Sequence, residues 1–317
     1  MSLGYIVRRL LGAIPLLLGI SVILFTIIQL APGGPLDMYA ENPSVSPEAL
    51  AQIAARYGLD QPPPIQYFMW LSAMLTGDWG YSIRTGRPVL GEIVMRLGPT
   101  LQLGGLAMLI SLLIAVPLGI VSAARRGSRL DSAVTVISFA GISTPVFWLA
   151  LLLQLLFSVQ LGWLPSAGYQ SIGDGSFLDR LRYIAMPAAV LSFATIASWS
   201  RFIRSGMVDV LNQDYIRTAY AKGRSERGVV AFHALRNAMI PAVTIIAVDF
   251  VTIISGAVIT ETVFAWPGIG RLFMESMNGR DYPMLMGLMM MGSVGIILAN
   301  IIADLAYASL DPRIRYG

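Results

Sequence analysis

The sequence contains no cysteine, and this absence excludes several classes of function. Disulfide frameworks, thiolate nucleophiles and thiolate metal sites are all removed. The chain also has a single histidine, His233, so a transition-metal site would have to rely on carboxylates alone, which is an unfavourable ligand set. No Ser/His/Asp or Cys/His pattern indicates hydrolysis. We therefore expect no catalytic residues and no metal site in this chain.

Lysine is almost absent as well, since Lys222 is the only one among 317 residues. It lies in the sequence Ala-Lys-Gly-Arg, which does not fit the GxxxxGK[ST] loop that cradles phosphates. The sequence therefore predicts that this chain is not an enzyme and holds no nucleotide cofactor of its own.

Charge is scarce overall. Charged residues make up 13% of the chain and hydrophobic residues 56%, whereas soluble domains usually carry about 25% charged residues. The deficit indicates a bilayer environment. The net charge of +4 is modest and concentrated in one set of loops, so we expect no nucleic-acid partner.

The sequence contains several long hydrophobic runs. Six of them approach the length of about 20 residues that a helix needs to cross the hydrocarbon core. They are Leu10–Ala31, Thr100–Ala124, Val134–Ser158, Ile184–Ile203, Ile240–Thr260 and Met284–Tyr307. The first follows Arg8 and Arg9 but is too long for a typical signal peptide, and no clear cleavage site follows it, so we interpret it as a retained anchor. The sequence predicts an all-α polytopic membrane protein with six transmembrane helices.

Lys and Arg divide unevenly between the two sets of loops. The N-terminus, the 125–133 loop, the 201–239 loop and the C-terminus together hold 14 of the 22 basic residues. The remaining eight are spread over the longer segments 32–99, 159–183 and 261–283. Since basic residues favour the cytoplasmic side, we expect both termini to face the cytoplasm.

The chain divides into three parts in this interpretation: residues 1–31 with the first span, an extracytoplasmic region at 32–99, and a core at 100–317. Within the second part, Ser46–Tyr57 is predicted as a helix that starts at an N-cap serine and ends before Gly58. A break at Pro62-Pro63-Pro64 precedes the amphipathic segment Ile65–Leu75, which suits a membrane interface. Two interpretations stay open: this region contacts a partner, or it packs on its own helices.

One basic stretch between the fourth and fifth spans differs from the rest: "RTAYAKGRSERGVVAFHALRNAMIP", from Arg217 to Pro241. Asp214–Ala221 is predicted as a short helix stopped by Gly223, with an apolar face of Tyr215, Ile216, Ala219 and Tyr220. Ser225 is a candidate N-cap for a second helix, with apolar positions at Val229, Val230, Phe232 and Leu235. Such a hairpin suits docking into a groove on another protein, or else lying on anionic lipid.

This stretch resembles the cytoplasmic coupling loop, or EAA loop, of ABC-importer permease subunits of the oligopeptide/dipeptide/nickel type. Three further segments resemble the same family in order. They are "YIVRRLLGAIPLLLGISVILFTIIQLAPGGP" near the N-terminus, "GDWGYSIRTGRPVLGEIVMRLGPTLQLG" at 77–104 and "ETVFAWPGIGRLFMESMNGRDYPMLMG" at 261–287. The resemblance covers nearly the whole chain and fits the first, dipeptide-permease-B-like subunit of such systems.

The resemblance implies a type I ABC-importer permease fold with a structured first periplasmic loop, in a bacterial inner membrane. It implies half of a translocation path for dipeptides or oligopeptides. The implied partners are a second, homologous permease subunit, two ATPase subunits that bind ATP and Mg, an extracytoplasmic solute-binding protein and the lipid bilayer. Importers of the same build for nickel chelates, glutathione or oligosaccharides are an alternative. An ion-coupled secondary transporter is an alternative from another class, and a membrane scaffold is a more distant one.

The resemblance also assigns residues within the cytoplasmic coupling loop, 205–239. Gly223 falls on the glycine of the loop, and Arg217-Thr218-Ala219 falls on its Glu-Ala-Ala, so the generic glutamate is missing here. The residues expected to couple to the ATPase are Asp214, Tyr215, Arg217, Thr218, Ala219, Lys222, Gly223, Arg224, His233 and Arg236.

Asp249 lies near the middle of the predicted fifth span, where a charge costs about 2.5–3.5 kcal/mol. It is either a translocation-path residue, together with Ser198 and Ser255, or a helix-pairing carboxylate that is protonated or bonded to Ser or Thr. In an ion-coupled transporter it would be the proton or cation site.

Two further features concern breaks in the chain. Pro117, Pro145 and Pro187 are expected to interrupt the second, third and fourth spans. The resemblance makes Trp266, Pro267 and Gly268 part of an external gate loop, whereas the residues alone indicate a turn with an aromatic residue at the membrane interface.

Overall fold

The computed structural model describes residues 3–30, 46–56, 60–225, 228–235, 237–239, 242–243, 245–246, 249 and 257–310. This part of the chain is helical, apart from turns, loops and one isolated antiparallel bridge between Tyr81 and Pro88. The predicted all-α class is confirmed for these residues.

The helices follow the chain in this order: α1 Leu3–Leu30, α3 Pro47–Arg56, α4 Pro63–Leu75, α5 Val89–Ala124, α6 Arg129–Ser143, α7 Val146–Leu153, the π-helix η1 Gln154–Gln160, α8 Phe177–Leu211, α9 Asp214–Ala221, the π-helix η2 Val229–Ala234, α12 Val258–Val263, α13 Ile269–Asn278 and α14 Tyr282–Leu310.

Three of these helices are long and apolar enough to cross a membrane: Arg8–Leu30 of α1, α5 and α8. The pair formed by α6 and α7 with η1 adds a fourth if its two halves make one span. Tyr282–Leu298 of α14 is a shorter apolar helix in the described part. The predicted fifth span, Ile240–Thr260, lies largely outside the described residues, so the count of six spans stays a prediction.

The third predicted span, Val134–Ser158, is wrong as a single helix. It consists of Arg129–Ser143 and Val146–Gln160, which meet at an angle of 100°. Thr144 between them is extended, with ψ of 121°. The physical reason is Pro145, because a residue before proline is disfavoured in the α region.

The other two prolines do not end their helices. Pro117 lies inside α5 and Pro187 inside α8, so each helix continues through its proline, and a bend at these positions stays a prediction. Helices α5 and α8 also begin earlier than predicted. Helix α8 starts after an N-cap serine, Ser176, whose Oγ accepts a hydrogen bond from the N–H of Asp179 at 3.2 Å.

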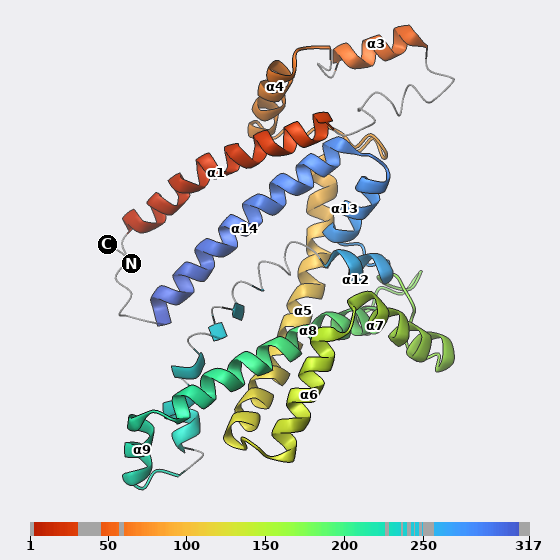
Figure 1. Cartoon of the computed structure of the whole chain (residues 1–317). Helices are drawn as coiled ribbons and strands as arrows, with labels where there is room; N and C mark the ends of the chain where they lie inside the picture. The colour runs from red at the N-terminus through yellow and green to blue at the C-terminus, as the bar shows by residue number, and fades with distance from the viewer. Residues whose placement is uncertain are drawn as a thin grey trace.

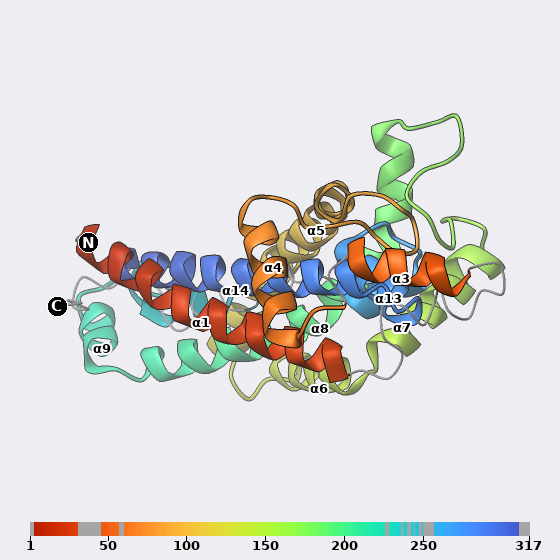
Figure 2. The ribbon, with the colours of Figure 1, turned by 90° about the horizontal axis from the view of Figure 1, so that it is seen from above.

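Helix α5 extends along the molecule in Figure 1, with α12 and α13 beside its first half and α6 beside its second. Helices α1 and α14 lie side by side in both ribbon views (Figures 1 and 2) and contact each other. Helix α9 lies at one end of the molecule, and α3 and α4 lie at the other (Figure 1). We call these the α9 end and the α4 end.

Glycines let α8 pack closely against its neighbours. A Cβ at Gly119 of α5 would be 2.8 Å from the Cβ of Ile203, and one at Gly141 of α6 would be 2.9 Å from the Cβ of Ala197. Small residues at such crossings are typical of helices packed in membranes. Near the α9 end, Arg204 of α8 also donates two hydrogen bonds to Asp131 of α6, at 2.6 and 2.9 Å.

The first loop region contains the two predicted helices, with Gly58 outside the described residues. The predicted break at Pro62-Pro63-Pro64 is too long, because Pro63 and Pro64 already form the first turn of α4. Proline is tolerated there, since the first N–H groups of a helix have no intrahelical partner. Helix α4 packs on α1, where Tyr67 Oη lies 2.9 Å from Ser21 Oγ and the rings of Tyr67 and Phe25 are 5.5 Å apart.

Candidate functional site

The hairpin formed by α9 and η2 corresponds to the basic stretch singled out in the sequence. Helix α9 spans Asp214–Ala221, as predicted. Gly223 follows with φ of +76°, a left-handed conformation that favours glycine, and its N–H donates to the carbonyl of Tyr220 at 2.9 Å. Ser225 Oγ then accepts a hydrogen bond from the N–H of Gly228 at 3.3 Å, and the backbone carbonyl of Ser225 accepts one from the N–H of Val229 at 2.9 Å. The predicted stop and the predicted capping serine are both confirmed.

The second half of the hairpin differs from the prediction in its geometry. Val229–Ala234 is a π-helix, which includes His233 in its last turn. The side chain of Asn237 donates to Tyr215 Oη at 2.9 Å and to the carbonyl of His233 at 3.2 Å. Asn237 therefore connects the two halves of the hairpin. Arg236, a predicted coupling residue, lies outside the described residues.

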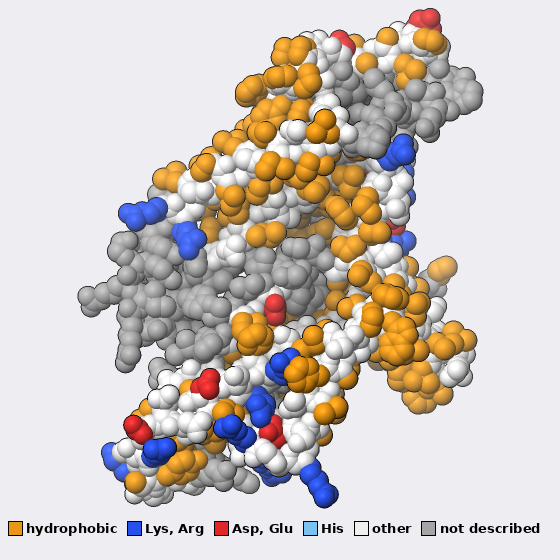
Figure 3. All heavy atoms as spheres, in the orientation of Figure 1, with side chains coloured by type: hydrophobic (Ala, Val, Ile, Leu, Met, Phe, Trp, Pro, Cys, Tyr) orange, Lys and Arg blue, Asp and Glu red, His pale blue; other side chains and the backbone are white. Residues whose placement is uncertain are grey.

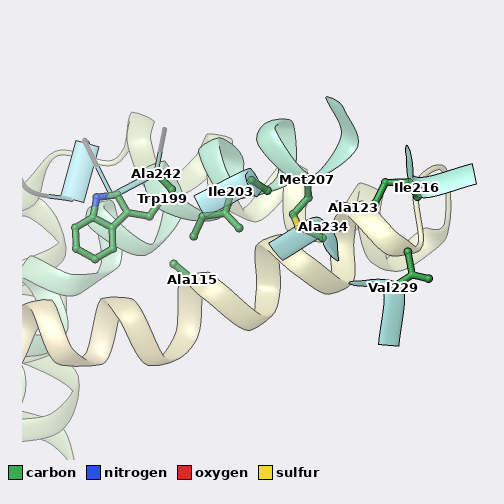
Figure 4. Close-up of a cluster of buried hydrophobic side chains, with 10 residues drawn as sticks. Ala115, Ala123, Trp199, Ile203, Met207, Ile216, Val229, Ala234 and Ala242 are labelled. Carbon is green, nitrogen blue, oxygen red and sulfur yellow. The ribbon is translucent and has the colours of Figure 1, made fainter. Parts of the chain in front are cut away.

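The apolar face of the hairpin packs on its own chain. Ile216 of α9 and Val229 and Ala234 of η2 are fully buried. They share one cluster with Ala123 of α5 and Met207 of α8 (Figure 4). Because α5 and α8 contribute to the same cluster, the hairpin is fixed to both long helices.

Two tyrosines depart from the predicted apolar face. Tyr215 is 43% exposed and Tyr220 is 41% exposed, whereas Ala219 packs against the buried cluster. The prediction is therefore right for Ile216 and Ala219 and wrong for the tyrosines. An α-helix of eight residues cannot direct residues 215, 216, 219 and 220 equally toward one core, since they span too wide an arc.

The polar residues of the hairpin lie on its outer surface. Those that are exposed include Asp214, Arg217, Thr218, Lys222 and Arg224, and Gly223 is exposed beside them. Arg217 and Asp214 form an ion pair at 3.4 Å with both side chains largely in solvent, so the pair contributes little to stability. In Figure 3 many of the visible Lys and Arg side chains lie over the α9 end. The hairpin thus combines a buried apolar face with an accessible polar one.

Inside the molecule, Asp249 accepts a hydrogen bond from the indole Nε1 of Trp199 at 2.6 Å. Trp199 belongs to α8 and is 1% exposed. The predicted Ser or Thr partner of the carboxylate is thus a tryptophan. Ser198 is half-buried on the same helix, and Ser255 lies outside the described residues. The grouping of these three residues as a translocation path therefore stays a prediction.

Trp266 is not an interfacial aromatic residue, as the residues alone predicted, because it is 1% exposed. Its Nε1 donates to the backbone carbonyl of Pro99 in α5 at 2.9 Å. Its ring packs edge-on against Tyr169 at 4.9 Å and shares a cluster with Leu103 of α5. Gly268 is buried and Pro267 is half-buried in the same turn.

Glu261 was missed by the sequence reasoning, although it starts the quoted segment 261–287. Its side chain is fully buried in the first turn of α12. Thr100 Oγ1 of α5 donates to Oε1 at 2.8 Å, and the N–H of Arg271 donates to Oε2 at 3.0 Å. Burial raises the pKa of the Glu261 carboxyl, while these hydrogen bonds lower it. The available signal was the pair Gly268 and Gly270, which leaves room for a carboxylate at the start of α13.

A second connection joins the quoted segments 77–104 and 261–287. Asp281 is 1% exposed and accepts hydrogen bonds from Ser82 Oγ and from the N–H of Ile83, the latter at 3.1 Å. Glu275 of α13 accepts from Arg84 at 3.1 Å and from Arg271 at 2.8 Å. The two segments, far apart in sequence, fold against each other.

Among the residues that the structure describes, no group of three His, Asp or Glu side chains is placed to hold a metal ion. The expected lack of a cofactor in this chain stays a prediction.

Comparisons with known proteins cover nearly the entire chain. Residues 115–316 match the family described as binding-protein-dependent transport system inner membrane component. Residues 2–104 match the N-terminal family of the membrane components of such systems.

Individual relatives align over 99% of this chain and 99% of their own length. The oligopeptide transport system permease protein AppB of Bacillus subtilis strain 168 is 43% identical. The dipeptide transport system permease protein DppB of Escherichia coli K12 is 37% identical.

Among solved structures, a chain of the MetNI methionine ABC transporter in an inward-facing conformation resembles this structure with a TM-score of 0.57. The match covers 70% of this chain and 97% of that one at 16% identity, a likeness that concerns the fold alone.

Proposed function

Because this chain belongs to the family of binding-protein-dependent transport system inner membrane components, we propose that it is the permease subunit of an ATP-driven peptide importer. The peptide class is supported by the full-length relatives, which are oligopeptide and dipeptide transport permeases. The chain forms half of the translocation path for dipeptides or oligopeptides, and a second, homologous permease subunit forms the other half.

ATP hydrolysis takes place in two partner ATPase subunits, which bind ATP and Mg. The lack of a phosphate-binding loop around Lys222 supports this division of labour. A solute-binding protein on the opposite side of the inner membrane delivers the peptide. In this arrangement the α9 end and both termini face the cytoplasm, as the distribution of Lys and Arg favours.

The hairpin of α9 and η2 is the docking element for an ATPase subunit. The observation that carries this proposal is its two-sided build: Ile216 and Val229 are fully buried against α5 and α8, whereas Arg217, Lys222 and Arg224 are exposed. An ATPase that pulls on the exposed face therefore moves two membrane helices. His233 and Arg236 belong to the same docking element by their place in the sequence.

Asp249 has a role in helix pairing in this proposal. The hydrogen bond from Trp199 supports a helix-pairing role for this carboxylate rather than contact with the peptide. Ser198 and Ser255 remain the proposed path residues on α8 and in the fifth span. Trp266, Pro267 and Gly268 belong to the external gate loop in this proposal.

The proposal is tested by reconstituting the chain with its partner permease, its ATPase subunits and the binding protein in vesicles. We expect uptake of labelled dipeptides and oligopeptides that requires ATP and stops when the ATPase subunits cannot hydrolyse it. Uptake that persists without ATP and collapses when a proton gradient is dissipated would contradict the proposal and favour an ion-coupled transporter.

A further inference from the structure

We propose that residues 261–271, which we call the outer clamp, are fastened to α5 by Glu261 and therefore move with α5 as one body. This inference rests on the proposed function, because it concerns how a movement at the α9 end reaches the external gate loop. Glu261 is a positioning residue in this scheme. It acts on the gate loop through Thr100 and α13 and does not contact the peptide.

The first observation is the arrangement around the Glu261 carboxylate. Oε1 accepts from Thr100 Oγ1 at 2.8 Å, and Oε2 accepts from the N–H of Arg271 at 3.0 Å. Thr100 Oγ1 in turn accepts from the N–H of Ile269 at 2.8 Å. One carboxylate therefore joins α12, the start of α13 and α5. The N–H groups of Ile269 and Arg271, in the first turn of α13, thus find acceptors in Thr100 and Glu261, since the first N–H groups of a helix have no intrahelical partner.

The second observation is the position of Trp266. Its Nε1 donates to the carbonyl of Pro99, the residue directly before Thr100, at 2.9 Å. The outer clamp is thus attached to two consecutive residues of α5, once through a carboxylate and once through an indole. Both attachments are buried, since Glu261 is 0% exposed and Trp266 is 1% exposed.

The third observation is that the turn at Gly268 and Gly270 is tightly packed, with no space for a side chain at either glycine. A Cβ at Gly268 would be 2.3 Å from the Glu261 carboxylate, and a Cβ at Gly270 would be 2.7 Å from the Cα of Val258. Under 3 Å such contacts require a shift of the backbone or the carboxylate. The glycines let the turn close over the carboxylate, so the clamp fits one arrangement of the loop.

Helix α5 connects this clamp to the coupling hairpin. Thr100 and Ala123 lie on one uninterrupted helix, about 35 Å apart at 1.5 Å per residue. Ala123 shares its buried cluster with Ile216 and Val229 of the hairpin (Figure 4). A displacement of the hairpin therefore acts on one part of α5, and the outer clamp is attached to another part of the same helix.

Replacing Glu261 by glutamine separates the clamp role from a loss of the fold. Glutamine keeps the shape of the side chain but offers one acceptor oxygen, so either Thr100 or Arg271 loses its acceptor. A buried donor without a partner is unfavourable, which loosens the clamp. The matched control is Thr262→Val on the same helix, because Thr262 is exposed and its hydroxyl donates within α12, to the carbonyl of Val258 at 2.7 Å.

The experiment has two readouts in the same variants. The first uses a cysteine at Leu272, which is 1% exposed and packs against Val89 and Ile93 of α5. The chain has no native cysteine, so a charged maleimide reports only on this position. In the purified protein we expect Glu261→Gln to raise the labelling rate about fivefold or more, and Thr262→Val to leave it within about twofold. An unchanged rate in Glu261→Gln overturns the proposal, whatever the transport assay gives.

The second readout is the ratio of peptide uptake to ATP hydrolysis in reconstituted vesicles. We expect Glu261→Gln to lower uptake about tenfold or more while ATP hydrolysis stays within about twofold of the unmodified protein. Equal losses of both activities indicate a purely structural role and overturn the proposal. If the unmodified protein itself shows no ATP-dependent uptake, the proposed function fails, and the labelling result alone then decides whether the clamp exists.

Discussion

Ile216 packs the hairpin of α9 and η2 against the long helices. It is fully buried between α9 and the cluster of α5 and α8. We expect Ile216→Ala to cost about 2–5 kcal/mol of packing, to expose the hairpin and to lower peptide uptake. The measurement is the rate of tryptic cleavage at the arginines and lysine of 217–224. Tyr220→Ala is the control, since Tyr220 is 41% exposed; equal cleavage rates in the two variants would show that Ile216 does not hold the hairpin.

The ion pair between Asp131 and Arg204 gives a second prediction at this scale. Asp131 accepts both bonds of Arg204 and a third from Ser122 Oγ at 2.6 Å. Asp131→Asn leaves the partly buried guanidinium without its counter-charge, which we expect to cost about 3 kcal/mol. The thermal unfolding temperature of the purified protein should fall, while Asp209→Asn, at an exposed position of α8, should leave it unchanged. A Tm for Asp131→Asn equal to that of the unmodified protein refutes this account.

Single residues also mark the limit of what the sequence can predict. Gly223 was identified correctly, because a glycine after a short amphipathic segment is a local signal for a helix end. Glu261 and Trp266 were not, because their burial depends on Thr100 and Pro99, more than 160 positions away in the chain. A glutamate and a tryptophan at the edge of a hydrophobic run are expected to be exposed when only the local sequence is considered. Only the fold shows that α5 covers them.

At the scale of elements, the turn after α9 gives the third prediction. Gly223 has φ of +76°, and its N–H donates a hydrogen bond to the carbonyl of Tyr220. Proline cannot replace it, because its ring fixes φ near −65° and it has no N–H to donate. We expect Gly223→Pro to abolish co-purification of the ATPase subunits and peptide uptake, with the chain still inserted in the membrane. Gly223→Asn is the control, since asparagine tolerates the left-handed region. Normal transport by Gly223→Pro would count against the docking role of the hairpin.

Elements were predicted best where caps and glycines mark their ends. Helices α3 and α9 match the predicted segments to within a residue. The third span was predicted as one helix because its hydropathy is continuous across Thr144 and Pro145. The 100° bend between its halves depends on the geometry before a proline and on packing of α7 against α8 and α12, which hydropathy does not record.

For the whole molecule, the fold of an ABC-importer permease was predictable because motifs of this family occur along nearly the entire chain. The comparisons confirm that fold and the family. What the motifs did not indicate is how they meet. The segments 77–104 and 261–287 were separate signals in the sequence, and in the structure they form one packed unit through Asp281, Glu275 and Glu261.

This packed unit leads to a prediction about movement. Gly287 of α14 lies against Val89 of α5, where a Cβ would be 2.6 Å from the Val89 Cγ1. Cysteines at both positions are therefore close enough for a disulfide, and the chain has no other cysteine to compete. If the start of α5 moves together with α14 and the outer clamp, oxidation of Val89→Cys/Gly287→Cys should leave ATP-dependent uptake within about twofold. The two single variants, oxidised in the same way, control for the substitutions themselves. Uptake that is lost on oxidation and regained on reduction would show that these elements separate during transport, and that the unit is not rigid.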